Sequence, residues 1–109
     1  MIGSGAIGCE LLKNFAMAEL GVGEEGGNII VTDPDHIENS NLNRQFLFRE
    51  KHLQKPKSVT AAAAAAQMNK RLKGHIKPRL DKVCEATKET FTNEFFESLT
   101  IVANALDNV

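Results

Sequence analysis

Apolar and polar residues alternate along the first third of the chain with two different periods. Between residues 7 and 20, apolar side chains recur every three or four positions, with charged and amide residues between them, which predicts an amphipathic helix that starts in a run of glycines. Glycine and acidic residues at 21–28 end that helix in a loop. The β-branched run at 29–32, closed by Asp33 and Pro34, predicts a short buried strand.

The second half of the chain repeats the alternation of helix and strand. Ser58 is expected to be the N-cap of a helix that runs through the alanine-rich residues 59–72, because alanine has the highest intrinsic helix propensity. A weak strand interrupted by a proline at 75–83, a short helix at 93–99 and a strand at 100–107 should follow. The order predicts an α/β fold, a Rossmann-like open and mostly parallel sheet with helices on both faces.

A long segment without a sustained period, residues 34–57, connects the first full strand to the alanine-rich helix. Only one short helical turn, at 43–47, is predicted within it. The polar run SNLNRQ at 40–45 lies directly before the apolar run FLF at 46–48. Because structured loops of this length commonly carry function, we expect 46–48 to anchor the segment to the core and to hold its polar neighbours at a binding site.

The bulk properties exclude several classes of protein. The 109 residues fit one domain, and a formal net charge of -1 offers no general attraction to nucleic acid or to an anionic membrane. The two cysteines are not spaced as zinc ligands, and the apolar runs are too short to span a bilayer. We therefore expect a cytosolic or nuclear protein that binds neither nucleic acid nor membrane.

The glycines begin at position 3, where a complete strand would normally precede them, and the chain stops directly after the strand predicted at 100–107. We therefore expect a piece of a larger protein, truncated at both ends. Such a piece should fold poorly by itself and lack activity.

The sequence GSGAIG at 3–8 fits the G-x-G-x-x-G pattern of a nucleotide-binding turn. Glycines there let the backbone come close to a phosphate, and the N-terminus of the following helix favours an anion. Asp33, at the end of the second strand, is placed to accept hydrogen bonds from ribose hydroxyls. These two features suit NAD as well as ATP. The pattern of a P-loop is absent from the sequence.

Additional side chains favour a nucleoside triphosphate. Arg44 offers a planar fork of donors to phosphate oxygens, and Lys57 lies beside the expected start of a helix, where its charge and the helix dipole act together. Asp107 follows a predicted strand at the edge where such sheets bind ligands, and its carboxylate could hold Mg²⁺. Neutral amides from the same loop complete the set: Asn41, Asn43 and Gln45, the last of which could instead brace the loop.

Five motifs, in this order, resemble the adenylation domain of the ubiquitin-activating enzymes: GSGAIGCELLKNFAM, VTDPD, SNLNRQFLF, KPKS and ALDNV. The resemblance spans the whole chain and implies that residues 1–109 are part of one ATP-binding adenylation domain. It implies ATP and Mg²⁺ as cofactors and Arg44, Lys57 and Asp107 as catalytic residues, with Asp107 on the metal. The implied nucleotide-binding residues are Gly3, Ser4, Gly5, Ala6, Ile7, Gly8, Asp33, Asn41, Asn43, Arg44, Gln45, Lys57, Lys82, Val83 and Asp107.

The resemblance also implies a reaction. The C-terminal glycine carboxylate of ubiquitin, or of a ubiquitin-like protein, would attack the α-phosphate of MgATP to give an acyl-adenylate and pyrophosphate. A cysteine outside these residues would then take the acyl group, since neither Cys9 nor Cys84 matches the thioester cysteine of the family. A ubiquitin-conjugating enzyme would bind through other domains.

Two other interpretations stay open. An NAD(P)-binding oxidoreductase would explain the glycines and Asp33, but would leave Arg44, Lys57 and Asp107 without a shared purpose. An inactive structural half of a heterodimer in the same superfamily would keep the fold without the chemistry.

Overall fold

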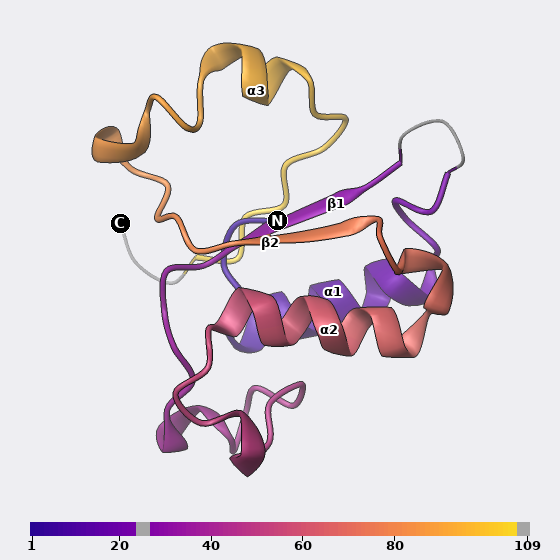
Figure 1. Cartoon of the computed structure of the whole chain (residues 1–109), viewed down its shortest axis with the longest axis vertical. Coiled ribbons are helices and arrows are strands. Elements are labelled where there is room, and N and C mark those ends of the chain that lie inside the picture. The colour runs from indigo at the N-terminus through magenta and orange to yellow at the C-terminus, as the bar shows by residue number, and fades with distance from the viewer. Residues whose placement is uncertain (24–26, 107–109) are drawn as a thin grey trace.

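The computed structural model describes residues 1–23 and 27–106 and shows a small sheet between helices (Figure 1). The helices and strands are α1 (Ala6–Met17), β1 (Ile29–Thr32), α2 (Lys57–Met68), β2 (Ile76–Arg79) and α3 (Asn93–Glu97). Among the described residues, four single turns of 3₁₀ helix lie between them: η1 (Asn39–Asn41), η2 (Glu50–His52), η3 (Lys70–Leu72) and η4 (Glu85–Thr87). Within the described ranges, no helix is long and apolar enough to cross a membrane.

The strands run parallel, as the alternation of elements predicted. β1 pairs with β2 in a register that sets Ile29 opposite Ile76. Ile2 makes parallel bridges to Thr32 on one side and to Asn104 on the other, so the order across the sheet is β2, β1, Ile2, Asn104. Parallel pairing joined by helical crossovers confirms the α/β prediction.

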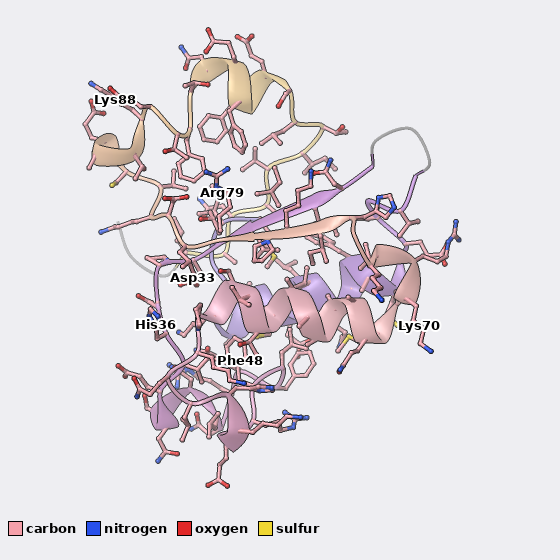
Figure 2. All side chains as sticks on the ribbon, in the orientation of Figure 1. Asp33, His36, Phe48, Lys70, Arg79 and Lys88 are labelled. Atoms are coloured by element: carbon pink, nitrogen blue, oxygen red, sulfur yellow. The ribbon has the colours of Figure 1, made fainter. Side chains whose placement is uncertain are left out.

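Helices cover both faces of the sheet, also as predicted. α1 and α2 pack against each other, α2 packs against both strands, and α3 lies on the opposite side (Figure 1). The buried core on the α1 and α2 face contains the Phe48 side chain, which Figure 2 labels below α2. This core consists of Cys9, Leu12, Ala16, Val31, Ile37, Leu47, Phe48, Ala61, Ala65 and Leu72.

The α3 face is less closely packed. Phe91, Phe95 and Phe96 stack edge to face or tilted, with ring centroids 5.4 to 6.4 Å apart. Together with Ile2 and Ile30 they line an apolar cavity of about 420 Å³.

The strand predicted at 100–107 is wrong. Among residues 100–106, which the structure describes, only Asn104 pairs, with Ile2, and Ile101 and Val102 are 73% and 46% exposed. Gly3 has a φ of 95°, so the backbone turns away after Ile2 and the pairing does not continue beyond Asn104.

The predicted start of the alanine-rich helix is also corrected. The helix begins at Lys57, with Pro56 in the N-cap position, so Ser58 lies inside its first turn. The Ser58 hydroxyl is buried and donates a hydrogen bond of 2.7 Å to the carbonyl of Arg79, at the end of β2. Ser58 therefore ties the helix to the sheet instead of capping it.

Further boundaries also differ from the prediction: α2 ends at Met68, β2 at Arg79 and α3 at Glu97, instead of at residues 72, 83 and 99. The first helix ends at Met17 instead of residue 20, because Glu19 and Gly21 have positive φ angles and turn the backbone away. The helical turn expected at 43–47 forms earlier, at η1, where the Asn41 side chain accepts a hydrogen bond from the backbone N–H of Glu38 at 2.8 Å.

Candidate functional site

Packing requires two glycines of the GSGAIG motif, Gly3 in the Gly-rich turn before α1 and Gly8 in the first turn of α1. A Cβ on Gly3 would lie 2.7 Å from the carbonyl oxygen of Ala105, and Gly3 also has a positive φ. A Cβ on Gly8 would lie 2.5 Å from the carbonyl oxygen of Gly3. Both contacts are to backbone atoms, so any other residue would force the turn, the helix and the 103–105 segment apart.

Gly5 is different, because packing does not require it. Its φ is negative, and the nearest atom to an added Cβ is Nε2 of Gln45 at 3.7 Å, an ordinary contact distance. No side chain caps α1 at Gly5, so the free N–H groups of the first turn have no side-chain partner there. Space beside a glycine and uncapped amides together form a place where an anion can approach the backbone.

Asp33 connects the turn to the end of β1 (Figure 2). One carboxylate oxygen accepts hydrogen bonds from the backbone N–H and the hydroxyl of Ser4, at 2.8 and 3.2 Å. The other oxygen accepts from the backbone N–H of Asp35 at 2.8 Å. Asp33 thus lies at the Gly-rich turn, as expected, and fixes its position relative to the sheet. Its role toward ribose stays a prediction.

The segment between β1 and α2 is closed at its base. His36 and Pro56 form an antiparallel bridge, and the N–H of Lys57 donates to the carbonyl of Asp35 at 3.0 Å. At the far end Leu47 and Phe48 are buried in the core, and Phe46 is partly buried against it. The predicted anchoring by 46–48 is confirmed.

The polar residues of this segment divide into two groups. Asn41 and Gln45 point inward and are buried, whereas Asn43 and Arg44 are exposed. Arg44 donates to the carbonyl of Ser40 at 2.7 Å and to the Asn43 side chain at 3.4 Å, so it contacts its own turn. The structure therefore does not bring Asn43 or Arg44 into contact with the Gly-rich turn.

Gln45 is the most informative residue of the inward group. Its side chain is 3% exposed, and its Nε2 lies beside Gly5. Its Oε1 is the one buried side-chain oxygen or nitrogen without a hydrogen-bond partner in the part of the chain that the structure describes. Since a buried polar atom without a partner is costly, an unpaired amide beside an open glycine indicates a place for a hydrogen-bonding ligand.

Lys57 contributes a largely buried cation to the same region. It is the first residue of α2, is 8% exposed, and its ammonium makes no hydrogen bond or ion pair with any residue in the described ranges. Its charge acts on Cys9, whose Sγ contacts the carbonyl of Ser4 at 3.7 Å. The ammonium therefore lies within electrostatic range of the Gly-rich turn.

Cys9 joins this cluster although the motifs did not single it out. Burial raises the pKa of its thiol to about 11; the Lys57 charge opposes the rise, and Glu10 and Asp33 add to it. The available signal was its position, one helical turn after Gly5. Neither Cys9 nor the exposed Cys84 forms a disulfide.

The remaining predicted residues lie elsewhere. Val83 lines the apolar cavity under α3, and Lys82 is exposed, its carbonyl accepting a hydrogen bond from the Thr87 hydroxyl. Asp107 lies outside the described residues. Among the residues that are described, no three His, Cys, Asp or Glu side chains gather as a metal site would require. The structure thus brings together the Gly-rich turn with Asp33, Gln45 and Lys57.

A parallel α/β sheet whose first helix starts in a Gly-rich turn, with an acid at the end of the next strand, defines a Rossmann-like domain. The comparisons with known proteins give the family. All of residues 1–109 match the ThiF family, and the chain belongs to it. The resemblance seen in the motifs is thereby confirmed.

Curated relatives match the chain over its full length. It is 59% identical to ubiquitin-activating enzyme E1 1 of Candida albicans and 57% identical to ubiquitin-like modifier-activating enzyme 1 of Homo sapiens. Identity to ubiquitin-like modifier-activating enzyme 6 of Mus musculus is 56%. The 109 aligned residues are 100% of this chain and 10 to 11% of those proteins, so the chain spans about a tenth of their length.

Solved structures of Escherichia coli MccB share the fold. The crystal structure with MccA-N7isoASN has a TM-score of 0.69 and 27% identity, over 83% of this chain and 24% of that one. A second MccB structure, with AMPCPP and MccA, has a TM-score of 0.68 and 28% identity over 84% and 25%.

Proposed function

We propose that this chain is the ATP-binding part of the adenylation domain of a ubiquitin-activating enzyme. Its role would be to bind MgATP so that the C-terminal glycine carboxylate of ubiquitin, or of a ubiquitin-like protein, is adenylated. The observation that carries the proposal is the unpaired Gln45 amide beside the open Gly5, within a cluster that also holds the buried ammonium of Lys57. The names of the relatives support activation of ubiquitin or of a ubiquitin-like protein, and the AMPCPP in the MccB structure supports ATP as the nucleotide.

The residues present fit a triphosphate. A phosphate could approach Gly5 and the uncapped amides of α1, where the helix dipole is positive. The Lys57 ammonium would meet the same anion in an environment with little water, where a charge interaction is strong. The Gln45 amide can present a donor or an acceptor by rotating half a turn, and so could bond either a phosphate or a hydroxyl.

Magnesium would be held by Asp107, whose carboxylate is the kind of oxygen ligand that Mg²⁺ prefers. The metal would supply neutralisation of phosphate charge. Asp33 would accept from ribose while it keeps the Gly-rich turn on β1.

The residues of this chain would act by positioning and by charge. Attack of a carboxylate on a phosphate needs no nucleophile from the protein, so Lys57 would stabilise developing negative charge and the turn would fix the nucleotide. Arg44 would have to exchange its bond to the Ser40 carbonyl for a phosphate oxygen. Cys9 is unsuited to accept the acyl group, because it is buried and its raised pKa keeps it a thiol.

The partners follow from the same proposal. The substrate would be ubiquitin or a ubiquitin-like protein, and a ubiquitin-conjugating enzyme would bind elsewhere in the full-length protein. Cytoplasm and nucleus are the compartments that such a role implies.

The test is ATP–pyrophosphate exchange by the full-length protein with ubiquitin and with several ubiquitin-like proteins. Lys57→Ala and Asp107→Ala should each lower the exchange rate about a hundredfold or more, because each removes a charge that acts on the phosphates. Lys73→Ala, which removes an exposed lysine of the loop before β2, serves as the matched control and should change the rate little. NAD binding without exchange would instead support the oxidoreductase, and no nucleotide binding would support the structural half.

A further inference from the structure

Basic and acidic residues are segregated along this chain, although its net charge is -1. Residues 51–80 contain no aspartate or glutamate. They contain eight of the 13 basic residues: Lys51, Lys55, Lys57, Lys70, Arg71, Lys73, Lys77 and Arg79. The basic residues therefore occupy the span from η2 through α2 to β2, and the first part of it borders a groove.

The groove lies between the exposed side of α2 and residues 46–55, and its volume is about 570 Å³. Its floor on α2 is mainly apolar, with the polar side chains of Thr60 and Gln67 beside the apolar ones. Val59 and Met68, which are 44% and 41% exposed, lie in it with Ala63 and Ala64. Because alanines leave the helix backbone close to the surface, another chain could pack closely against α2 here.

The rim of the groove is cationic. The ammonium groups of Lys51 and Lys55 make no hydrogen bond or ion pair within the described parts of the chain, so their charges are free to meet a partner. Arg49 lies on the same rim and is held by the carbonyls of Phe46 and Phe48. Partial burial, and then the charges of Lys51, Lys55 and Arg49, lower the pKa of His52 at the same edge.

We propose that this groove docks an acidic, amphipathic segment of a partner protein. The apolar side chains of that segment would rest on Val59, Ala63 and Met68, and its carboxylates would meet Lys51 and Lys55. Charge complementarity favours an acidic occupant. The ammonium groups of Lys51 and Lys55 are unpaired, and residues 51–80 contain no aspartate or glutamate that would compete for them. An amphipathic helix laid in an apolar groove is a common mode of recognition.

A single-stranded nucleic acid fits the groove less well. Its bases would need aromatic surfaces for stacking, and among the residues that line the groove there is one phenylalanine, Phe46, and no tyrosine or tryptophan. The ammonium of Lys13 already lies over the Phe46 ring, 5.6 Å from its centroid.

The test uses the full-length protein and a fluorescent synthetic helical peptide with leucines on one face and glutamates on the other. Lys51→Glu combined with Lys55→Glu should weaken binding of this peptide, measured by fluorescence anisotropy, about tenfold or more. Lys73→Glu combined with Lys77→Glu makes the same change of charge at exposed residues outside the groove, and should weaken binding less than about threefold. Ala63→Glu, on the exposed floor, should weaken binding as much as the rim pair.

Three results would overturn the proposal. The wild-type protein could fail to bind the peptide, or the two pairs of variants could lose affinity equally. The third is equal or tighter binding of a lysine-substituted peptide or of an oligothymidylate. Circular dichroism of each variant shows that the fold is retained, and nucleotide exchange, measured separately, keeps failure of this groove distinct from failure of the proposed function.

Discussion

At the scale of single residues, three glycines of one motif serve different purposes. A Cβ added to Gly8 would meet the backbone of Gly3, whereas a Cβ added to Gly5 would meet only Nε2 of the Gln45 side chain. We expect Gly8→Ala to lower the free energy of unfolding by about 1–3 kcal/mol, the usual range for an overpacked site. Gly5→Ala should change it by less than about 0.5 kcal/mol, as at sites without close contacts, yet weaken ATP binding.

Urea denaturation and calorimetric titration with ATP measure the two effects separately. Equal destabilisation by Gly5→Ala and Gly8→Ala would contradict the distinction. Unchanged ATP affinity in Gly5→Ala would show that the nucleotide does not approach there.

Gln45 allows a second test, because its unpaired Oε1 is a cost to the free protein. Gln45→Met keeps the shape of the side chain and removes the buried polar atom. We expect stability to stay the same or to rise by up to about 1 kcal/mol, and ATP affinity to fall about tenfold from the loss of one hydrogen bond. Asn41→Ala is the contrasting variant, since it removes an acceptor of the Glu38 N–H and should lower stability. A marked loss of stability in Gln45→Met would contradict the view that the unpaired Oε1 is a cost to the free protein.

At the scale of elements, α2 has a packed side and an open side. Ala65 is buried in the core, and Ala63 is exposed in the groove. Ala65→Leu should lower the free energy of unfolding by about 1–3 kcal/mol, because the added carbons have no room. Ala63→Leu should leave it within about 0.5 kcal/mol. Thermal or urea unfolding of the two variants gives the comparison, and similar losses in both would show that the open side is packed as well.

The helices could be predicted more accurately than the strands. A helix forms its hydrogen bonds within one segment, so the apolar spacing in α1 and the alanines of α2 were sufficient. A strand depends on its neighbour, and among the described residues 100–106 only Asn104 pairs, with Ile2. At the start of α2, Pro56 already has a φ of -60°, and the Lys57 N–H is bonded to Asp35, so the first turn did not need Ser58 as a cap.

The same limit applies to the candidate site. The glycines and Asp33 could be found because motif and position along the chain imply their placement. The inward direction of Gln45 and the outward direction of Arg44 could not be predicted, because in a segment without a regular period the direction of each side chain depends on contacts with distant residues. Here those contacts are the bridge between His36 and Pro56 and the burial of Phe48 in the core.

At the scale of the whole molecule, one buried thiol links stability to pH. Burial raises the pKa of Cys9 from 9.0 to about 11, so the folded state holds its proton where the unfolded state has released it. The contribution of the Cys9 thiol to the free energy of unfolding is complete below pH 9. It is lost as the pH rises toward 11, by roughly 3 kcal/mol at most for a shift of this size.

Urea unfolding across this pH window checks the expectation. Cys9→Ala should flatten the decline in stability, whereas Cys84→Ala, which changes an exposed thiol, should retain it. The variants are compared by how steeply the free energy of unfolding falls with pH, not by its absolute value, because removing the Cys9 sulfur also leaves a small cavity. A slope that persists in Cys9→Ala would assign the effect to other groups.

The contact of Gly8 with Gly3, and of Gly3 with Ala105, bears on how the history of such domains can be interpreted. Selection for a folded protein is enough to keep Gly3 and Gly8 through descent, whether or not a lineage still binds nucleotide. Gly5 has no such structural protection and would be free to drift once its ligand was lost. A descendant that had become an inactive scaffold would therefore still display most of the glycine signature, and the residue at position 5 would record the change.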